Sequence, residues 1–329
     1  MRQLIWLAGS IAALAAIGVA LPRAVNPYVL QVIIMCGINV ILAVSLNLIN
    51  GFTGQFSIGH AGFMAVGAYA STVFTLQIGV KWVAALEALG APGWLAQGAA
   101  LLMALLVGGG LAAVAGYLVG LPSLRLRGDY LAIVTLGFGE IIRVMILNID
   151  AIGGARGIAG IPVWTNVFWV GAGVLAVVLV SHHLAHSTHG RALFAIRDDE
   201  VAAEALGVDT TRYKVMAFVI GAFFAGVAGG LFSHYLTAVN PNSFTFLKSI
   251  EVVAMVVLGG MGSISGSVMA AILLTLAPEV LRPVKDYRMV FYSIMLIVLM
   301  ITRPQGLMGS RELSLPAFLR RRRSATGPA

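Results

Sequence analysis

A cluster of four histidines is the group of side chains in this sequence best spaced to bind a metal ion. If they continue the apolar helix before them, three of the four would share one helical face, from which imidazole nitrogens can ligate a metal. A membrane oxygenase would need further ligands, and the other two histidines, His60 and His234, are isolated. The alternative is a set of histidines beside lipid headgroups, and we favour it and expect no metal site. The four are His182, His183, His186 and His189, with His182, His186 and His189 on the shared face.

Glu140 and Arg143 are charged residues inside an apolar stretch. Their spacing of three residues lets the two side chains pair on one face of a helix. Charges at membrane depth are costly and usually face a bundle interior or a transport path. We therefore predict either a structural ion pair or a contact to a transported substrate. Lys248 and Glu251 have the same spacing and leave the same two interpretations open.

Residues 187–214 form the longest polar stretch inside the chain. Residues 191–206 fit a short amphipathic helix with Ala203 on its apolar face, and Gly207 suits the position after its C-terminus. Such a helix between two membrane spans could be gripped by a cytoplasmic protein or could lie on lipid headgroups. Three consecutive acids argue against an anionic membrane surface, so we predict a protein partner. The docking residues that we predict are Arg191, Leu193, Ile196, Arg197, Asp198, Asp199, Glu200, Glu204, Leu206 and Gly207.

The composition of the whole chain is that of an integral membrane protein. Of its 329 residues 59% are hydrophobic and only 10% are charged, and the mean hydropathy is +0.95. So little charge could not cover the surface of a soluble enzyme. The single cysteine, Cys36, excludes an intramolecular disulfide. The net charge of +8 lies mostly between apolar runs, which indicates topology control and contact with membrane lipid rather than nucleic acid.

Long apolar runs predict an all-α polytopic protein with about ten transmembrane helices. Cytoplasmic termini would place roughly twice as many of the 21 Lys and Arg on the cytoplasmic side as on the other, so we predict N-in and C-in. The first run could also be a signal peptide, although its length favours a retained span. We divide the chain into a transmembrane domain, 1–310, and a basic cytoplasmic tail, 311–329. The predicted spans are 4–21, 28–49, 61–79, 94–121, 129–149, 165–185, 215–236, 250–262, 265–281 and 288–302.

Two stretches rich in glycine and polar residues, 50–60 and 259–266, interrupt this pattern. Irregular backbone at membrane depth persists only where protein or a watery cavity satisfies it, and broken helices of this kind often line a transport path. For 50–60 a broken helix and an ordinary turn are equally supported, whereas 259–266 favours a turn. Polarity and depth suggest as translocation-path residues Asn47, Gln55, Ser57 and Glu140.

The chain has no visible nucleotide site, because none of its four lysines follows a glycine as a phosphate-binding loop requires. We expect no catalytic activity and no cofactor in this chain. If transport is driven by ATP, a second chain must supply the ATPase.

Collinear motifs between about residues 40 and 308 carry a resemblance to a known family. They are the run Arg125–Glu140, Asn47-Leu48 with Gly51, Gly54, Ser57, Gly59 and Ala61, Gly190–Ala192 leading to Arg197–Glu200, Ser243–Phe246, Val257–Ser263 and Arg303–Leu307. Together these motifs resemble LivM-type permeases of ABC importers for branched-chain amino acids. The resemblance implies an importer fold with many helices, a homologous LivH-type permease as partner, two ABC ATPase subunits that bind ATP and Mg, and a periplasmic substrate-binding protein. It also implies that 190–207 is the coupling helix and that the protein lies in the bacterial inner membrane.

The sequence departs from the resemblance at Arg156, which adds a positive charge on the predicted outer face and bears on docking of the binding protein. Relatives of the family also carry urea, short amides or aromatic acids, and these substrates stay open. A secondary carrier and a membrane enzyme built on the histidine cluster are the other classes.

Overall fold

The computed structural model describes residues 24–123, 129–282 and 306–309, together with scattered positions from 14 to 21 and from 293 to 302. Nearly all of the regular structure is helical, and six helical segments are long and apolar enough to cross a membrane. They confirm an all-α polytopic membrane protein. The six are α2 (Pro27–Asn50), the continuous helix His60–Ala88, α5 (Gly93–Ser123), α6 (Asp129–Asn148, spanning from Tyr130), α7 (Val167–Ala185) and α10 (Thr210–Leu236).

The other predicted spans have different outcomes. Helices α11 (Phe246–Gly259) and α12 (Ile264–Val280) form where spans were predicted, with 14 and 17 residues. The predicted first and last spans, 4–21 and 288–302, and the tail 311–329 fall largely or wholly outside the described residues. The count of about ten helices and the orientation of the termini therefore stay predictions.

The predicted span 61–79 is longer in the structure, where the helix continues to Ala88. Helix α3 (His60–Phe74) passes through one π-helical turn, η1 (Thr75–Gly79), into α4 (Val80–Ala88). The hydroxyl of Thr75 lies 2.8 Å from Nε2 of the buried His234 on α10, so the two helices are joined at the irregular turn. π-Turns inside helices are uncommon, and this buried contact pairs the hydroxyl of Thr75 with an imidazole nitrogen on the neighbouring helix.

Helix α10 packs closely against α3, α5 and α2, and glycines lie at several of the contacts. A Cβ added at Gly67 of α3 would lie 2.1 Å from the Cα of Gly226 on α10, and one at Gly226 would lie 2.5 Å from the Cβ of Ala112 on α5. Small residues let membrane helices approach closely and gain dispersion contacts. Glycine therefore sets the distance between the central helices.

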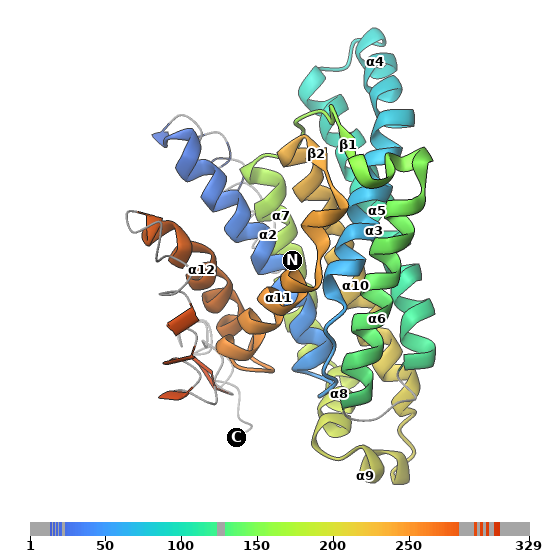
Figure 1. Ribbon diagram of the computed structural model, residues 1–329, viewed down its shortest axis with the longest axis vertical. Helices are drawn as coiled ribbons and strands as arrows, with labels where there is room; N and C mark the ends of the chain where they lie inside the picture. Colours follow the sequence, from blue (N-terminus) through green and yellow to red (C-terminus); the bar gives the residue numbers. More distant parts are fainter. Residues whose placement is uncertain are drawn as a thin grey trace, which may run out of the picture.

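Helices α2, α11 and α12 pack side by side in a second group (Figure 1). The turn between α11 and α12 uses Gly260 and Gly262, which have φ of 105° and 92°. A Cβ at Gly266 would lie 2.1 Å from the carbonyl oxygen of Gly259, so the two helices touch at the turn. The preference for a turn at 259–266 is confirmed.

The molecule has two distinct ends (Figure 1). Helices α8 (Thr188–Asp198) and α9 (Glu200–Ala205) lie at one end, and α4 lies at the other. Strand β1 (Ile158–Ala159) pairs antiparallel with β2 (Ala238–Val239) on the α4 side. Short 3-10 turns complete the described elements: η2 (Asp150–Ile152), η3 (Gly154–Arg156) and η4 (Pro241–Phe244).

Candidate functional site

The predicted amphipathic helix 191–206 is two helices, α8 and α9, because the helical conformation is interrupted at Asp199. Asp199 has extended backbone angles, φ −156° and ψ 108°, and its carboxylate accepts hydrogen bonds from the N–H groups of Val201 and Ala202. An aspartate at the N-cap satisfies first-turn donors that have no helical partner. Gly207 has φ of 82° directly after α9, which confirms it as the glycine that ends the helix.

Three apolar residues of this segment face the protein's own core, whereas Val201 and Leu206 are exposed. Leu193 and Ile196 are 0% and 3% exposed, and Ala203 is also buried. They anchor the two helices to the transmembrane domain, so Leu193 and Ile196 are wrong as direct contacts for a partner. Leu206, assigned to the same apolar face, is instead 84% exposed. The helix is interrupted at Asp199. The residues after it are therefore rotated relative to a single continuous helix, on which the prediction depended.

Two of the predicted docking acids bind α10. The carboxylate of Glu200 lies 2.7 Å from Nζ of Lys214, a lysine side chain that is only 4% exposed. Glu204 accepts a hydrogen bond of 2.8 Å from the hydroxyl of Thr210. A buried ammonium without its carboxylate would be strongly destabilising, so Glu200 is held in place. These contacts make α9 move with the start of α10.

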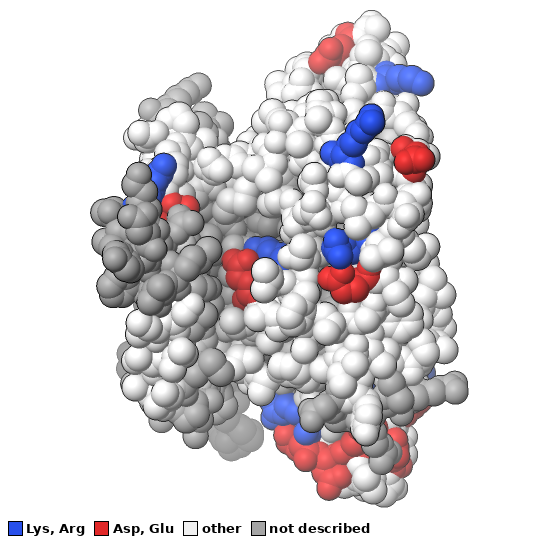
Figure 2. Space-filling view, viewed as in Figure 1, with Lys and Arg blue, Asp and Glu red and all other residues white. Residues whose placement is uncertain are grey.

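The residues left for a partner form an exposed surface at this end of the molecule, where Figure 2 shows acidic and basic side chains gathered. Arg197 pairs with Asp198 at 3.0 Å and stacks over the Phe194 ring, 5.0 Å from its centroid. An exposed pair of this kind contributes little stability. We call this surface the docking surface, and its exposed residues are Arg191, Arg197, Asp198, Asp199, Val201, Leu206 and Gly207.

Residues 51–59 form an irregular and mostly buried segment between α2 and α3. The side-chain oxygen of Asn50 accepts from the N–H of Ser57 at 3.1 Å, and the hydroxyl of Thr135 on α6 accepts from the N–H of Ile58 at 3.1 Å. Protein side chains therefore satisfy backbone groups that a helix would otherwise pair. The structure shows nine residues without helix between α2 and α3, and whether 50–60 is a broken helix on a transport path or a turn stays a prediction.

Helix α8 lies directly against residues 51–59. A Cβ at Gly54 would be 3.0 Å from Cγ of Arg197, and the rings of Phe52 and Phe194 are 5.1 Å apart. Residues of α7, α8, 51–59 and the α11–α12 turn line a common groove of about 310 Å³. A displacement of α8 would therefore press on both irregular segments without an intermediate element.

The predicted path residues are in different surroundings. Asn47 has a structural role. Its side-chain oxygen accepts a hydrogen bond from the N–H of Gly262 at 2.8 Å, and its amide donates to the carbonyl of Ser263 at 3.1 Å. The buried side chains of Gln55 and Ser57 have no hydrogen-bond partner among the described residues. Unpaired buried polar groups are costly, so these two residues stay path candidates.

The predicted ion pair on α6 forms. Arg143 Nε lies 2.8 Å from Glu140 Oε2, and the side chains are 23% and 36% exposed. Glu140 also borders a small crevice with Gly59 of the irregular segment and Ser249 of α11.

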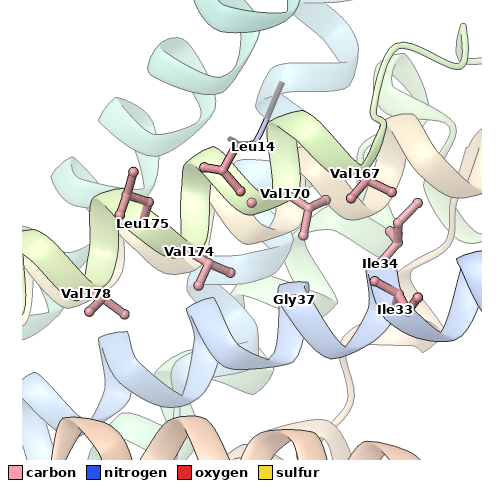
Figure 3. Close-up of a pocket in the computed structure, with 10 residues that line it drawn as sticks. Leu14, Ile33, Ile34, Gly37, Val167, Val170, Val174, Leu175 and Val178 are labelled. Carbon is pink, nitrogen blue, oxygen red and sulfur yellow. The ribbon is translucent and has the colours of Figure 1, made fainter. Parts of the chain in front are cut away.

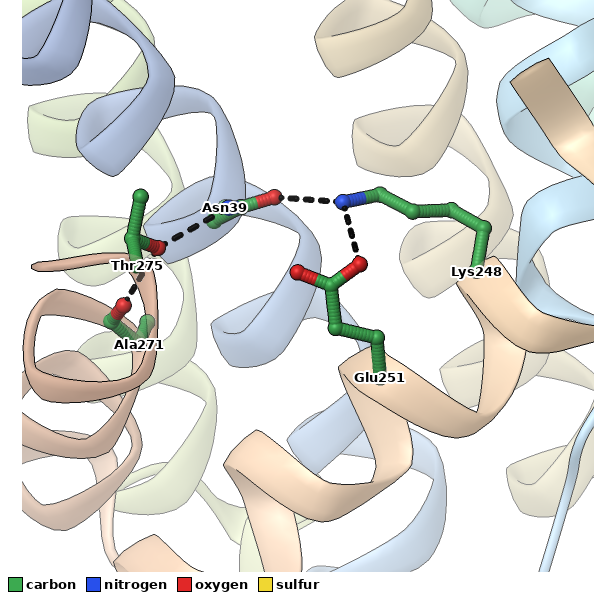
Figure 4. Close-up of polar contacts among 5 residues, drawn as sticks. All are labelled: Asn39, Lys248, Glu251, Ala271 and Thr275. Atoms are coloured by element: carbon green, nitrogen blue, oxygen red, sulfur yellow. Dashed lines mark hydrogen bonds and ion pairs between the residues drawn. The ribbon is translucent and has the colours of Figure 1, made fainter. Parts of the chain in front are cut away.

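A second ion pair belongs to a longer chain of polar contacts across α11, α2 and α12 (Figure 4). Lys248 Nζ donates to Glu251 Oε2 at 3.0 Å and to Asn39 Oδ1 at 3.1 Å. The amide of Asn39 donates to the hydroxyl of Thr275 at 2.9 Å, which donates to the carbonyl of Ala271. Sequence analysis found the charged pair but missed Asn39 and Thr275, because single polar residues in apolar helices give no pattern.

The histidines do not share one helical face. Helix α7 ends at Ala185, so His189 lies on α8, where its ring is 5.8 Å from that of Tyr213. Nδ1 of His183 and of His186 each lies 2.8 Å from a carbonyl oxygen one turn back. Within the described part of the chain, no three His, Cys, Asp or Glu side chains are grouped as metal ligands.

An apolar groove of about 460 Å³ lies between α2 and α7 (Figure 3). Leu14, from the first apolar run, reaches into it, and a Cβ at Gly171 would be 2.7 Å from Leu14 Cδ2. Its described lining residues carry no polar side chain that could orient a charged ligand. It suits the packing of apolar chains.

The fold and the site together define a multi-pass helical membrane protein with an exposed, charged segment at one end. A family profile described as "Branched-chain amino acid transport system / permease component" matches residues 28–301. The chain belongs to this family of transport permeases.

Relatives agree with this assignment. The "High-affinity branched-chain amino acid transport system permease protein LivM" of Salmonella typhimurium is 38% identical, with 90% of this chain and 73% of the relative covered. The "Probable branched-chain amino acid transport permease protein LivM" of Methanocaldococcus jannaschii is 25% identical, with 87% and 94% covered. The permease protein LivH of Escherichia coli is 31% identical over 47% of this chain and 50% of its own length. No solved structure matches the chain.

Proposed function

We propose that this protein is a permease subunit of an ABC importer that moves branched-chain amino acids across the bacterial inner membrane. The relatives named LivM support the substrate class. The observation that carries the transport mechanism is the packing of α8 against both 51–59 and the α11–α12 turn. This packing connects an exposed surface with irregular backbone inside the transmembrane domain.

The mechanism is alternating access driven from the docking surface. Closure of two partner ATPases, which bind ATP and Mg, pushes on α8 and α9. Leu193 and Ile196 fix α8 to the transmembrane domain, and the Glu200–Lys214 pair fixes α9 to α10. The push therefore reaches α10 and the irregular segment as a rigid displacement, which can switch packed helices between two arrangements.

The orientation that goes with this mechanism places α8 and α9 in the cytoplasm and α4 on the outside, with both termini cytoplasmic. A periplasmic substrate-binding protein delivers substrate at the outer end. Arg156, exposed just before β1, contributes a positive charge to that end.

The second permease is a homologous chain of the LivH type, and its similarity to this chain supports pairing of two related folds around one path. The remaining partners are two ATPase subunits, the binding protein and membrane lipid.

The test is reconstitution of the whole importer. This chain is expressed with a LivH-type permease, the two ATPases and the binding protein from the same operon. Proteoliposomes with internal ATP should then take up radiolabelled leucine only when the binding protein is present. The variant Leu206→Ser should weaken retention of the ATPases at least tenfold, because an exposed apolar anchor is lost. Leu89→Ser is the matched control, since Leu89 is also 84% exposed but lies near the opposite end.

Three results would contradict the proposal in different ways. Uptake without any ATPase would point to a secondary carrier. ATPases that co-purify but respond to urea, an amide or an aromatic acid instead of leucine would keep the importer and change the substrate. Equal loss of ATPases in the Leu206→Ser and Leu89→Ser variants would show that α9 does not bind the ATPases.

A further inference from the structure

Charged side chains are few between the two ends of the face in Figure 2, and two groups of them lie at mid-height, one beside α11 and one over α6. Two ion pairs belong to these helices, Lys248–Glu251 and Glu140–Arg143. Half-exposed charges at this depth cannot face lipid tails cheaply, so this face borders a protein partner or a watery path. The two pairs differ in how they are held.

The α6 pair is self-contained, whereas the α11 pair is anchored to two other helices. Lys248 reaches Asn39 of α2, which in turn reaches Thr275 of α12 (Figure 4). The Lys248 and Glu251 side chains still keep 21% and 36% of their surface exposed. Anchoring on one side with exposure on the other is the arrangement of a binding site rather than of a filled core.

The position of Lys248 breaks a local rule of helix stability. Helix α11 begins at Phe246, so Lys248 lies in its first turn, where the helix dipole is positive and a cation is unfavourable. A structural pair would be more stable with its charges exchanged. Costly placement of this kind is typical of functional positions.

From these observations we propose that Lys248 and Glu251 bind the two charged groups of the transported amino acid. The substrate carboxylate binds the Lys248 ammonium, beside the first-turn N–H groups of α11, and the substrate ammonium binds Glu251. The site takes zwitterionic α-amino acids as a class. This assignment rests on the proposed function.

Charge balance makes the exchange feasible. The pair is neutral and the zwitterion is neutral, so the loaded site brings no net charge to membrane depth. In the described structure Lys248 Nζ uses two of its three hydrogens, for Asn39 and Glu251, which leaves one directed elsewhere. Asn39 holds the ammonium while Glu251 turns to the substrate.

The location fits the path. Ser249, between the two charged residues, accepts a hydrogen bond of 3.1 Å from the N–H of Ala61 at the start of α3. Helix α11, which carries the pair, therefore lies against the start of α3, the helix that follows the irregular segment 51–59. A displacement of that segment can open or close access to the pair.

The deciding experiment is an exchange of the two charges in the reconstituted importer. Lys248→Gln and Glu251→Gln should each lower leucine uptake at least tenfold while the purified complex keeps all of its subunits, which separates loss of binding from loss of assembly. The double variant Lys248→Glu/Glu251→Lys restores an ion pair and places the acid in the favourable first turn, so its Tm should match or exceed that of the wild type. Its uptake should nevertheless stay low, because the polarity of the site is reversed. Lys81→Gln on α4, an exposed lysine, is the control and should transport normally.

Recovery of uptake in the double variant would overturn the proposal, since a purely structural pair tolerates exchange. Normal uptake in both single variants would overturn it as well. A wild-type complex that takes up no leucine would instead refute the proposed function, and the binding assignment would fall with it.

Discussion

Asn47 shows how a polar residue at membrane depth can be structural although its type and position suggest a path. Its amide joins α2 to the α11–α12 turn through both of its polar atoms. Sequence alone placed Asn47, Gln55 and Ser57 in one group with Glu140, on the basis of their polarity and expected depth. The structure separates them: Asn47 is fully paired, while Gln55 and Ser57 are buried without described partners.

At this scale we predict that Asn47→Ala destabilises the turn without changing substrate recognition. The substitution leaves the N–H of Gly262 and the carbonyl of Ser263 without these partners, at roughly 1–3 kcal/mol for each buried group. The Tm of the purified complex should fall, while the leucine concentration giving half-maximal uptake stays constant. A raised half-maximal concentration at unchanged Tm would return Asn47 to the path.

At the scale of elements, the central helices depend on glycine contacts between α3, α5 and α10. Gly226 and Gly230 are four apart in the sequence, the spacing expected of close helix packing. Gly67 has no glycine four positions away, so the sequence gives no such pattern for it. The partner of each contact lies on another helix, so only the folded chain shows where backbone meets backbone.

We predict that Gly67→Ala separates α3 from α10. The new Cβ would meet the backbone of Gly226, which cannot rotate away, so the overpacking should cost about 1–3 kcal/mol or more. The protein should elute as aggregate or with a markedly lower Tm in detergent. Gly110→Ala is the matched control on α5, since nothing lies within 4 Å of its added Cβ. A Gly67→Ala protein as stable as the control would show that the helices can shift.

At the scale of the whole molecule, orientation decides how the two ends are used. The positive-inside bias predicts the α8–α9 end in the cytoplasm and the α4 end outside. The docking surface and the proposed delivery of substrate both require this orientation. Neither the helix lengths nor the helix packing distinguishes this membrane orientation from the inverted one.

Cysteine labelling tests the orientation in a background with Cys36→Ala. Leu89→Cys and Leu206→Cys start from equally exposed leucines near opposite ends. A membrane-impermeant maleimide should label the variant at 89 in intact spheroplasts and the variant at 206 only after permeabilisation. The reverse pattern would invert the topology and exclude α8 and α9 as cytoplasmic coupling helices.

The sequence by itself determined the class of fold, the charged pairs on α6 and α11, and most helical spans within the described residues to within about five positions, the helix that continues to Ala88 excepted. These features are local, because hydropathy sums over neighbouring residues and charge pairs three apart meet on any helix. Only the tertiary structure decided which polar groups are used and which are free. The contact of Lys248 with Asn39 joins residues 209 positions apart, and the break at Asp199 turns Leu206 outward while Leu193 stays buried. Such outcomes depend on helices packing across the molecule, and no window of sequence contains that information.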